Sequence, residues 1–563
     1  MRTLTTLAVL LATTSLAAAA GNESFIAQVG AANNALVGQT SGNNKQATIQ
    51  AGKKNSAVTS QSAAGSNTNE SGIMQIGASN GAAVGQTGGN NSQGTIQVGA
   101  KNFASTSQTN AAGSKKNKSG TAQFGYSNGS VVGQTAGNNT QGTLQVGGKN
   151  SSTTGQTTNA DGGFNSARTG QFGVGNNAVT SQNSTGIADK TTGPSFTRPG
   201  GNGGDNTSGV LQVGYQNNAL IGQNSAGSGN GLSARSGVEN NSGAVQIGGK
   251  NFASVSQDGT RAGTTANAAS NDSFVGQFGW ANGALVGQNG GNNSQGTLQF
   301  GSRNSATTGQ NATDLGATNS ALTLQGGSGN NALTSQVTTG SSGLPSGHGG
   351  TNTAATMQFG KGNNAVTGQD STGAGGFLIA NNGVANNAAT LQVGKGNYAA
   401  TSQSGNRPLV GADSVSNDSF VGQFGSGNGA VVGQTNGLNG QATVQIGKGN
   451  SATTSQANAK DSLNQNAAVT FQAGRHNNAV TSQIANPLSA GINGSLIAQI
   501  GNGNQAAVSQ TGMQNMIGAN LQGTVQVGNG NYATTAQASA ANVANTSVTA
   551  QFGSHNVAVT SQH

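Results

Sequence analysis

The chain has 563 residues, of which only 32% are hydrophobic, 4% aromatic and 6% charged, with a net charge of +9, 96 Gly and no Cys. This composition excludes several domains built on apolar cores, disulfide bonds and thiol chemistry, and the low charged fraction argues against charge-driven disorder. A polar chain rich in Gln and Asn is typical of cross-β material.

Residues 1–20 predict a secretory signal peptide. Arg2 supplies a positive start, residues 4–16 are mostly apolar, and residues 17–20 are Ala, which suits a cleavage site. A transmembrane anchor is the alternative, but the apolar run is too short. We therefore expect a secreted, extracellular mature chain, residues 21–563, without a transmembrane segment.

From residue 21 onward, a twelve-residue phrase, Q-x-G-x-x-N-x-[A/S]-x-x-x-Q, recurs twenty times. It begins at Gln28, Gln50, Gln75, Gln97, Gln123, Gln145, Gln171, Gln212, Gln246, Gln277, Gln299, Gln325, Gln358, Gln392, Gln423, Gln445, Gln472, Gln499, Gln526 and Gln551. A period in the twenties or thirties predicts one small unit stacked on copies of itself.

Each unit reads as strand, turn, strand. Residues 22–28 and 33–39 both alternate with the two-residue period of a strand that has one buried face. Residues two positions before many leading Gln are β-branched, as at Thr48 and Ile73, which agrees with strand propensity. The intervening Q-x-G-x-x-N segment predicts a turn, because Gly30 can adopt backbone angles closed to other residues.

The tightest units define the coil. Gln28 to Gln39 spans eleven residues and Gln39 to Gln50 eleven more, with Gln46 in place of Ala35, so one coil has 22 residues and two near-equivalent sides. We predict an all-β, amyloid-like, two-sheet parallel β-solenoid of about twenty strand-turn-strand coils over residues 21–563.

Departures from 22 residues occur on one edge only, here called the variable edge, and the longest lies between Gln182 and Gln212. This edge also holds most of the acidic residues, and its insertions are expected to be solvent loops. The Q-x-G-x-x-N segment keeps its length and is called the constant arc.

The interior is predicted to be a set of amide ladders. A buried amide without a partner costs about 1 to 3 kcal/mol, but in-register coils about 4.8 Å apart let each amide donate to one neighbour and accept from the other. We assign ladder formation and self-assembly to the phrase residues, represented by Gln28, Gly30, Asn33, Gln39, Gln50, Gly52, Asn55, Gln61, Gln526, Gly528, Asn531, Gln537, Gln551, Gly553, Asn556 and Gln562.

At these residues the chain resembles the curlin repeat of bacterial curli subunits, S-x5-Q-x-G-x-x-N-x-A-x3-Q, over essentially all of residues 22–562. Ser130 and Ser152 replace the family's Ala, and the clearest Ser lies four residues before the leading Gln instead of six. The resemblance implies an extracellular functional amyloid, exported through an outer-membrane channel and polymerised with a curli nucleator into biofilm fibres. This chain has many more repeats than curli subunits, and lacks their nonrepetitive targeting stretch after the signal peptide.

We expect open ends, because the first coil follows residue 21 and the last phrase closes at Gln562. Open ends favour a head-to-tail polymer, and twenty coils at about 4.8 Å each would form a rod of roughly 95 Å. The alternatives are a monomeric extracellular β-solenoid adhesin and a disordered low-complexity chain. Whether the chain would be a major subunit or a nucleator stays open.

Basic residues recur one or two positions before the Asn of the constant arc, and folding is expected to align them on one edge. They are Lys53, Lys54, Lys101, Lys149, Lys250, Arg303, Lys361, Lys395, Lys448 and Arg475. Solvation and protection against lateral clumping are one interpretation, and attraction to acidic polysaccharide, extracellular DNA or other polyanions is the other. Outward Phe residues after the leading Gln, such as Phe278 and Phe300, are expected to pack in rows along the sheet.

We expect no enzymatic activity, cofactor or metal. The four His are scattered (His348, His476, His555 and His563), Cys is absent, and the acids are mostly single residues. The enzymatic alternative is a parallel β-helix glycan lyase or hydrolase, which would need a cluster of acids or bases on one face.

Overall fold

The computed structural model describes residues 21–110, 116–159, 163–186, 204–226, 239–260, 270–313, 317–339, 350–372, 384–406, 415–459, 464–485, 491–512, 518–539 and 543–563. The predicted signal peptide, residues 1–20, and most of the long connection between Gln182 and Gln212 lie outside these ranges. The described residues form strands and no α-helix. Within them, therefore, no helix has the length and apolarity needed to cross a membrane.

The chain divides into two compact units, residues 1–142 and 143–563, and the division falls within β11 (Asn139–Gly148). In unit 1, the strands are β1 (Glu23–Ala31), β2 (Asn34–Thr40), β3 (Asn43–Lys53), β4 (Ser56–Ala63), β5 (Thr68–Ala78), β6 (Gly81–Gly88), β7 (Asn91–Ala100), β8 (Phe103–Asn110), β9 (Asn117–Tyr126) and β10 (Gly129–Thr135).

In unit 2, the odd-numbered strands are β13 (Asn165–Val174), β15 (Asn206–Tyr215), β17 (Glu239–Gly249), β19 (Ser270–Trp280), β21 (Asn293–Ser302), β23 (Thr318–Ser328), β25 (Thr351–Lys361), β27 (Ala385–Lys395), β29 (Ser416–Ser426), β31 (Leu438–Lys448), β33 (Gln465–Arg475), β35 (Ile492–Asn502), β37 (Ala519–Asn529) and β39 (Ala544–Ser554). The even-numbered strands are β12 (Ser151–Thr158), β14 (Asn177–Thr185), β16 (Asn218–Ala226), β18 (Phe252–Thr260), β20 (Gly283–Gly290), β22 (Ser305–Thr313), β24 (Asn331–Thr339), β26 (Asn364–Thr372), β28 (Tyr398–Asn406), β30 (Gly429–Thr435), β32 (Ser451–Asn458), β34 (Asn478–Ala485), β36 (Gln505–Gly512), β38 (Tyr532–Ser539) and β40 (Val557–Gln562).

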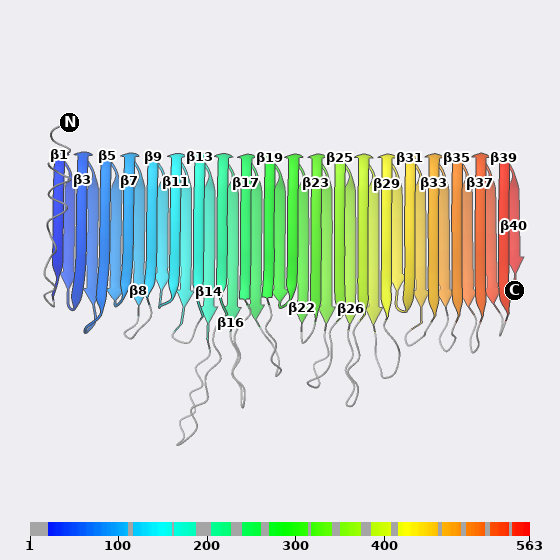
Figure 1. Ribbon diagram of the computed structural model, residues 1–563, viewed down its shortest axis with the longest axis horizontal. Helices are drawn as coiled ribbons and strands as arrows, with labels where there is room; N and C mark the ends of the chain where they lie inside the picture. Colours follow the sequence, from blue (N-terminus) through cyan, green and yellow to red (C-terminus); the bar gives the residue numbers. More distant parts are fainter. Residues whose placement is uncertain are drawn as a thin grey trace, which may run out of the picture. The chain divides into compact units, whose positions relative to one another are not determined.

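Within each unit, odd-numbered strands pair only with odd-numbered strands and even with even, always in parallel (Figure 1). Each coil contributes one strand to each sheet, and the two sheets lie back to back. The register is fixed by the phrase: in β23 and β25, for example, Gln325 lies opposite Gln358 and Gly327 opposite Gly360. The predicted two-sheet parallel β-solenoid is therefore confirmed.

The core lies between the two sheets and is mostly polar. The leading Gln of each phrase in unit 2 is buried, as are the second Gln and the Asn, except in the last coil. Small or β-branched side chains fill the positions between them, such as Ala332 at 1% exposure and Val275 and Ile497 at 0%. These β-branched positions are the ones that the alternation placed on the inner face.

The constant arc and the variable edge differ as predicted. Two residues separate the odd strand from the following even strand in every coil, as between Lys361 and Asn364. The connections on the other edge range from two residues, between Thr40 and Asn43, to the twenty between Thr185 and Asn206. Because insertions stay on one edge, the ladders of the core keep their register.

Candidate functional site

The two Gln positions of the phrase form two continuous ladders. In unit 2, the Nε2 of each leading Gln donates to the Oε1 of the leading Gln in the next coil, as from Gln325 to Gln358 at 2.8 Å. The second Gln does the same, as from Gln336 to Gln369 at 2.8 Å. Both Gln ladders thus donate towards the C-terminal coil.

The second hydrogen of each Gln amide crosses the core, which the sequence did not indicate. Gln325 Nε2 also donates to the carbonyl of Ser305 in the other sheet at 2.9 Å, and Gln336 Nε2 to the carbonyl of Ser320 at 2.8 Å. One side chain therefore joins neighbouring coils and both sheets. A residue that kept the volume but lost the amide would leave backbone carbonyls without this donor.

The Asn side chain of the constant arc has more hydrogen-bonding partners than either Gln. Asn330 Nδ2 lies within hydrogen-bonding distance of Asn304 Oδ1 (3.1 Å) and the carbonyls of Gly326 (3.0 Å) and Gly360 (3.3 Å). Its Oδ1 accepts from both the backbone amide and Nδ2 of Asn363, each at 3.1 Å. Neither Asp nor Gln can reproduce this set of bonds, which accounts for Asn in all twenty phrases.

A second Asn ladder runs along the variable edge, and our sequence analysis missed it. It consists of the Asn six residues before the leading Gln of each coil, as in Asn352 Nδ2 to Asn319 Oδ1 (3.1 Å) and Asn386 Nδ2 to Asn352 Oδ1 (2.9 Å). All twenty coils have Asn there, where the curlin pattern has Ser. Extending the alignment six residues upstream would have revealed it.

The position four residues before the leading Gln forms a smaller mixed ladder. Where a coil has Ser and the next has Gln, the Ser hydroxyl donates to the amide oxygen, as from Ser273 to Gln295 at 2.9 Å. The Gln amide then donates to the Thr two residues further on, Thr297. A Ser in one coil and a Gln at the same position in the next coil therefore form a hydrogen-bonded pair.

The phrase Gly is required by close backbone approach. Gly327 has φ 106°, and a Cβ built on it would lie 2.0 Å from the carbonyl oxygen of Gly360. The same contact recurs along the stack, as at Gly52, where the distance to the carbonyl oxygen of Gly77 is 1.9 Å. Any side chain here would push neighbouring coils apart.

The residue just before the constant-arc Asn is left-handed in every coil, a constraint that sequence analysis did not identify. It is Gly in some coils, such as Gly362 (φ 65°), but Lys101, Lys250 and Arg303 adopt φ 55–56° as ordinary L-residues. The enrichment of Gly at this position was the available signal. Part of the basic edge therefore stands on strained backbone.

All ten residues of the basic edge are exposed in the constant arcs. Lys361 lies opposite Lys395, and Lys448 opposite Arg475, in neighbouring strands, whereas most of the others are separated by neutral coils. The edge is therefore an interrupted row of charge.

Aromatic residues contact two of these charged side chains and stabilise their charged form. Lys101 Nζ donates to Tyr126 Oη at 2.9 Å, and this hydrogen bond and the tyrosine's charge raise the pKa of Lys101. Lys250 Nζ lies 5.3 Å from the centre of the Trp280 ring, within cation–π range.

The described acidic residues lie at the opposite edge. In unit 2 they include Asp272 and Asp418, near the beginnings of odd strands, and Asp370, near the end of β26, where burial raises the pKa of its carboxyl. The described ranges contain no group of three His, Cys, Asp or Glu arranged to hold a metal ion.

Searches of protein-family models and of curated proteins found no match to the chain.

Proposed function

We propose that the protein is a secreted structural protein whose coils stack between chains as they do within one, forming curli-like functional amyloid fibres. The fibres would serve the biofilm matrix, adhesion and surface attachment of a bacterial cell. The function then lies in the repeated interface between coils rather than in a single pocket.

The observation that carries this proposal is the complementarity of the two surfaces of a coil. Towards the C-terminal side, a coil offers Gln Nε2 donors and Asn Oδ1 acceptors, as in Gln325 and Asn330. Towards the N-terminal side it offers Gln Oε1 acceptors and Asn Nδ2 donors. Such an interface is heterologous and does not close on itself, so the same contact supports unlimited growth.

The resemblance to the curlin repeat supplies the biological part of the proposal. It favours export through an outer-membrane channel, action of a nucleator, and a place in the extracellular fibre. Such an assignment agrees with the apolar stretch at residues 4–16, which resembles a signal peptide.

The test is polymerisation of purified residues 21–563, followed by thioflavin fluorescence, electron microscopy and sedimentation. We expect monomer to convert to unbranched fibres, and fibre fragments to remove the lag phase. A chain that shows strand circular dichroism yet remains monomeric at high concentration would refute the proposal.

A paired variant isolates the ladder surface of β39 and β40. Replacing Gln551 and Gln562 with Glu removes amide donors and adds charge to the ladder positions, and should slow elongation at least tenfold. Replacing exposed Ser554 and Ser561 with Glu adds the same charge outside the ladder and should leave elongation near the parent rate.

The basic edge supports a second candidate function, a monomeric adhesin that binds polyanions. Lys361, Lys395, Lys448 and Arg475 are exposed and lie as two neighbouring pairs. Heparin-column retention of the parent, compared with a variant carrying Gln at these four positions, tests it. Equal retention at low salt would exclude a role for the edge in binding polyanions.

A further inference from the structure

The outer faces of the two sheets in unit 2 differ in chemistry. On the odd strands, three outward rows flank the leading Gln, at the positions three before, one before and one after it; we call these rows the apolar face. Members such as Leu322, Met357, Phe359 and Phe424 are 37–49% exposed. On the even strands, the outward residue before the second Gln is Gly or Ser from β12 to β36, as at Gly309 and Ser335.

Side-chain bulk on the apolar face is constant from coil to coil. Each of the fourteen odd strands from β13 to β39 presents two large side chains and one Gly or Ala across the three rows. The small residue changes place: in β21 it is Gly296, in β23 Gly326 and in β29 Gly422. Every large member is apolar except Arg168.

Neighbouring side chains occupy the space above some of these small residues. A Cβ on Gly276 would lie 2.6 Å from Leu298 Cδ1, 3.2 Å from a Phe274 ring carbon and 3.4 Å from a Phe278 ring carbon. The rings of Phe278 and Phe300 stack at 5.1 Å. Other small residues are left open, since a Cβ on Gly209 or Gly523 would meet nothing within 4 Å. The face therefore has open places that side chains of a packed partner can fill.

The apolar face is large enough for a stable interface. Three rows span about 17 Å along the strands, and fourteen coils at about 4.8 Å extend about 67 Å, which gives roughly 1,100 Å² per copy. A stable interface needs about 800 Å² per partner, and apolar patches on monomers seldom exceed about 600 Å².

We propose that the apolar face packs against the same face of a second copy, with the two coil stacks parallel and related by a two-fold axis along the stack. This contact is separate from the ladder interface, so it does not depend on growth through the ladders. Two features of the face select this orientation.

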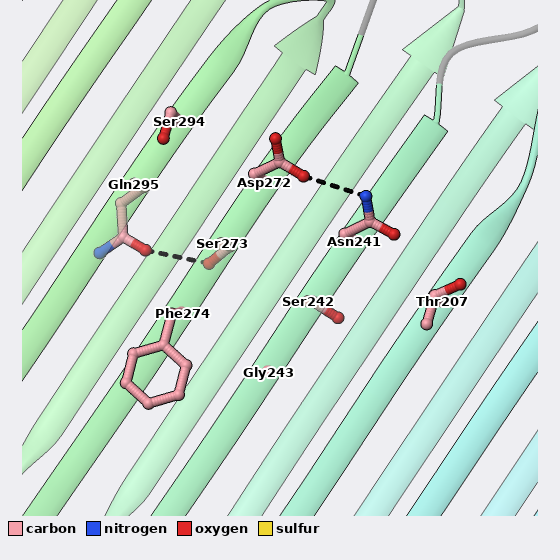
Figure 2. Close-up of a pocket in the computed structure, with 9 residues that line it drawn as sticks. All are labelled: Thr207, Asn241, Ser242, Gly243, Asp272, Ser273, Phe274, Ser294 and Gln295. Atoms are coloured by element: carbon pink, nitrogen blue, oxygen red, sulfur yellow. Dashed lines mark hydrogen bonds between the residues drawn. The ribbon is translucent and has the colours of Figure 1, made fainter.

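The first feature is the matching of large with small residues. In this orientation the row three before the Gln faces the row one after it. In nine of the fourteen strands one of these two residues is small and the other large, as in Gly296 and Phe300, or Leu322 and Gly326. A hollow beside Phe274 is lined in part by Gly243 (Figure 2) and has a volume of about 370 Å³. Ile247 of the partner would enter it.

The second feature is charge. The basic residues Lys361, Lys395 and Lys448 end their odd strands at the constant arc, whereas Asp272 and Asp418 lie near the strand beginnings at the variable edge. Figure 2 shows Asp272 in the outward row there, accepting a hydrogen bond from Asn241 at 3.0 Å. The parallel pair places acidic ends beside basic ends, whereas an antiparallel pair would place like charges together.

The test compares two triple variants made in the same three coils. The face variant is Leu322→Lys, Phe424→Lys and Val469→Lys, and the control is Leu333→Lys, Val431→Lys and Val480→Lys on the even strands. The parent exposures of these side chains are comparable, 37–49% and 38–45%. Mass per length is measured by dark-field electron microscopy on fibres, or molecular mass by sedimentation equilibrium on chains that do not polymerise.

We expect the parent and the control to have twice the mass per length of a single stack, and the face variant to fall to the single-stack value. In unpolymerised chains the same difference appears as dimer against monomer. A single-stack parent, equal effects of both triples, or a face that binds lipid vesicles and stays unpaired would each overturn the proposal. If the chains form dimers but no fibres, polymerisation through the ladders is refuted and pairing through the apolar face is not.

Orientation is tested by cross-linking mixed ¹⁴N and ¹⁵N chains. A zero-length carbodiimide reagent should join Lys361 or Lys395 of one chain to Asp418 or another variable-edge acid of the other. Within one copy these groups lie at opposite ends of strands about 30 Å long. Predominant interchain Lys–Lys links between constant arcs, obtained with an amine reagent, would contradict the parallel arrangement.

Discussion

Replacing Asn330 with Asp should strongly and locally destabilise the stack at neutral pH. Asn330 is 1% exposed, and the two hydrogens of its Nδ2 face three oxygens, at 3.0, 3.1 and 3.3 Å. Losing the two N–H donors costs about 1 kcal/mol each, and the buried carboxylate left facing those oxygens brings the total to about 3 to 5 kcal/mol. The bonds that its Oδ1 accepts from Asn363 would remain.

The pH dependence of this variant has a definite sign. Burial beside three oxygens raises the folded-state pKa of the new carboxyl above its unfolded value of about 3.9. A group with a raised folded pKa contributes stability below the unfolded pKa and loses it as pH rises through the folded value. The stability that the variant loses relative to the parent should therefore be smallest near pH 4 and largest at pH 7.

Hydrogen exchange measured by mass spectrometry over residues 318–372 is the assay. After correction for intrinsic rates, the variant should exchange at least about a hundredfold faster at pH 7 in its own and adjacent coils, since about 1.4 kcal/mol corresponds to a factor of ten. The control is Asn331→Asp, the same change one residue away, where the side chain is exposed and makes one contact, to Asn364 at 3.2 Å. Equal effects of the two variants, or a larger defect at pH 4, would refute the ladder energetics.

Three further predictions concern the constant arc and the glycines. Gly301→Ala should lower the local free energy of opening, measured by hydrogen exchange, by at least about 3 kcal/mol, because the new Cβ would lie 2.1 Å from the carbonyl oxygen of Gly327. The control is Gly309→Ala in the same coil, whose Cβ would meet nothing within 4 Å and which should be near neutral. Ala281→Gly should raise local stability by about 1 kcal/mol, since Ala281 has φ 56°; slower local exchange is the check, and faster exchange would argue against strain. Tyr126→Phe should lower the pKa of Lys101 towards its ordinary value in a carbon-13 titration, and an unchanged titration would show that the hydrogen bond is not what raises it.

The fold was predictable because periodicity and amide chemistry constrain each other. The two-residue alternation places Gln325 and Gln336 on the inner faces, and only an in-register stack gives their amides partners, so coil, sheets and parallel pairing followed together. The invariant Gly predicted unusual backbone, although its reason is the approach of the next coil rather than the turn alone.

Other features depend on geometry that a single repeat does not display. The bond from Gln325 across the core to Ser305 requires the distance between the sheets. The left-handed backbone before the constant-arc Asn is hard to recognise from sequence, because many coils have Lys, Ser, Ala or His there instead of Gly. The Asn ladder at the variable edge was visible in the sequence, and was missed because the alignment began at Gln. The apolar face, with two large side chains and one small one in each strand, emerges only when three rows are compared across fourteen strands.

The central claim is that chains join through the same amide ladders that hold one chain together, and a cryo-electron microscopy reconstruction of fibres grown from residues 21–563 tests it most directly. The account predicts strands perpendicular to the fibre axis, spaced about 4.8 Å apart without interruption through the junction between chains, with both Gln ladders and both Asn ladders continuing across it. Fibres in which the ladders stop at each junction, with chains joined through other surfaces, would contradict the account.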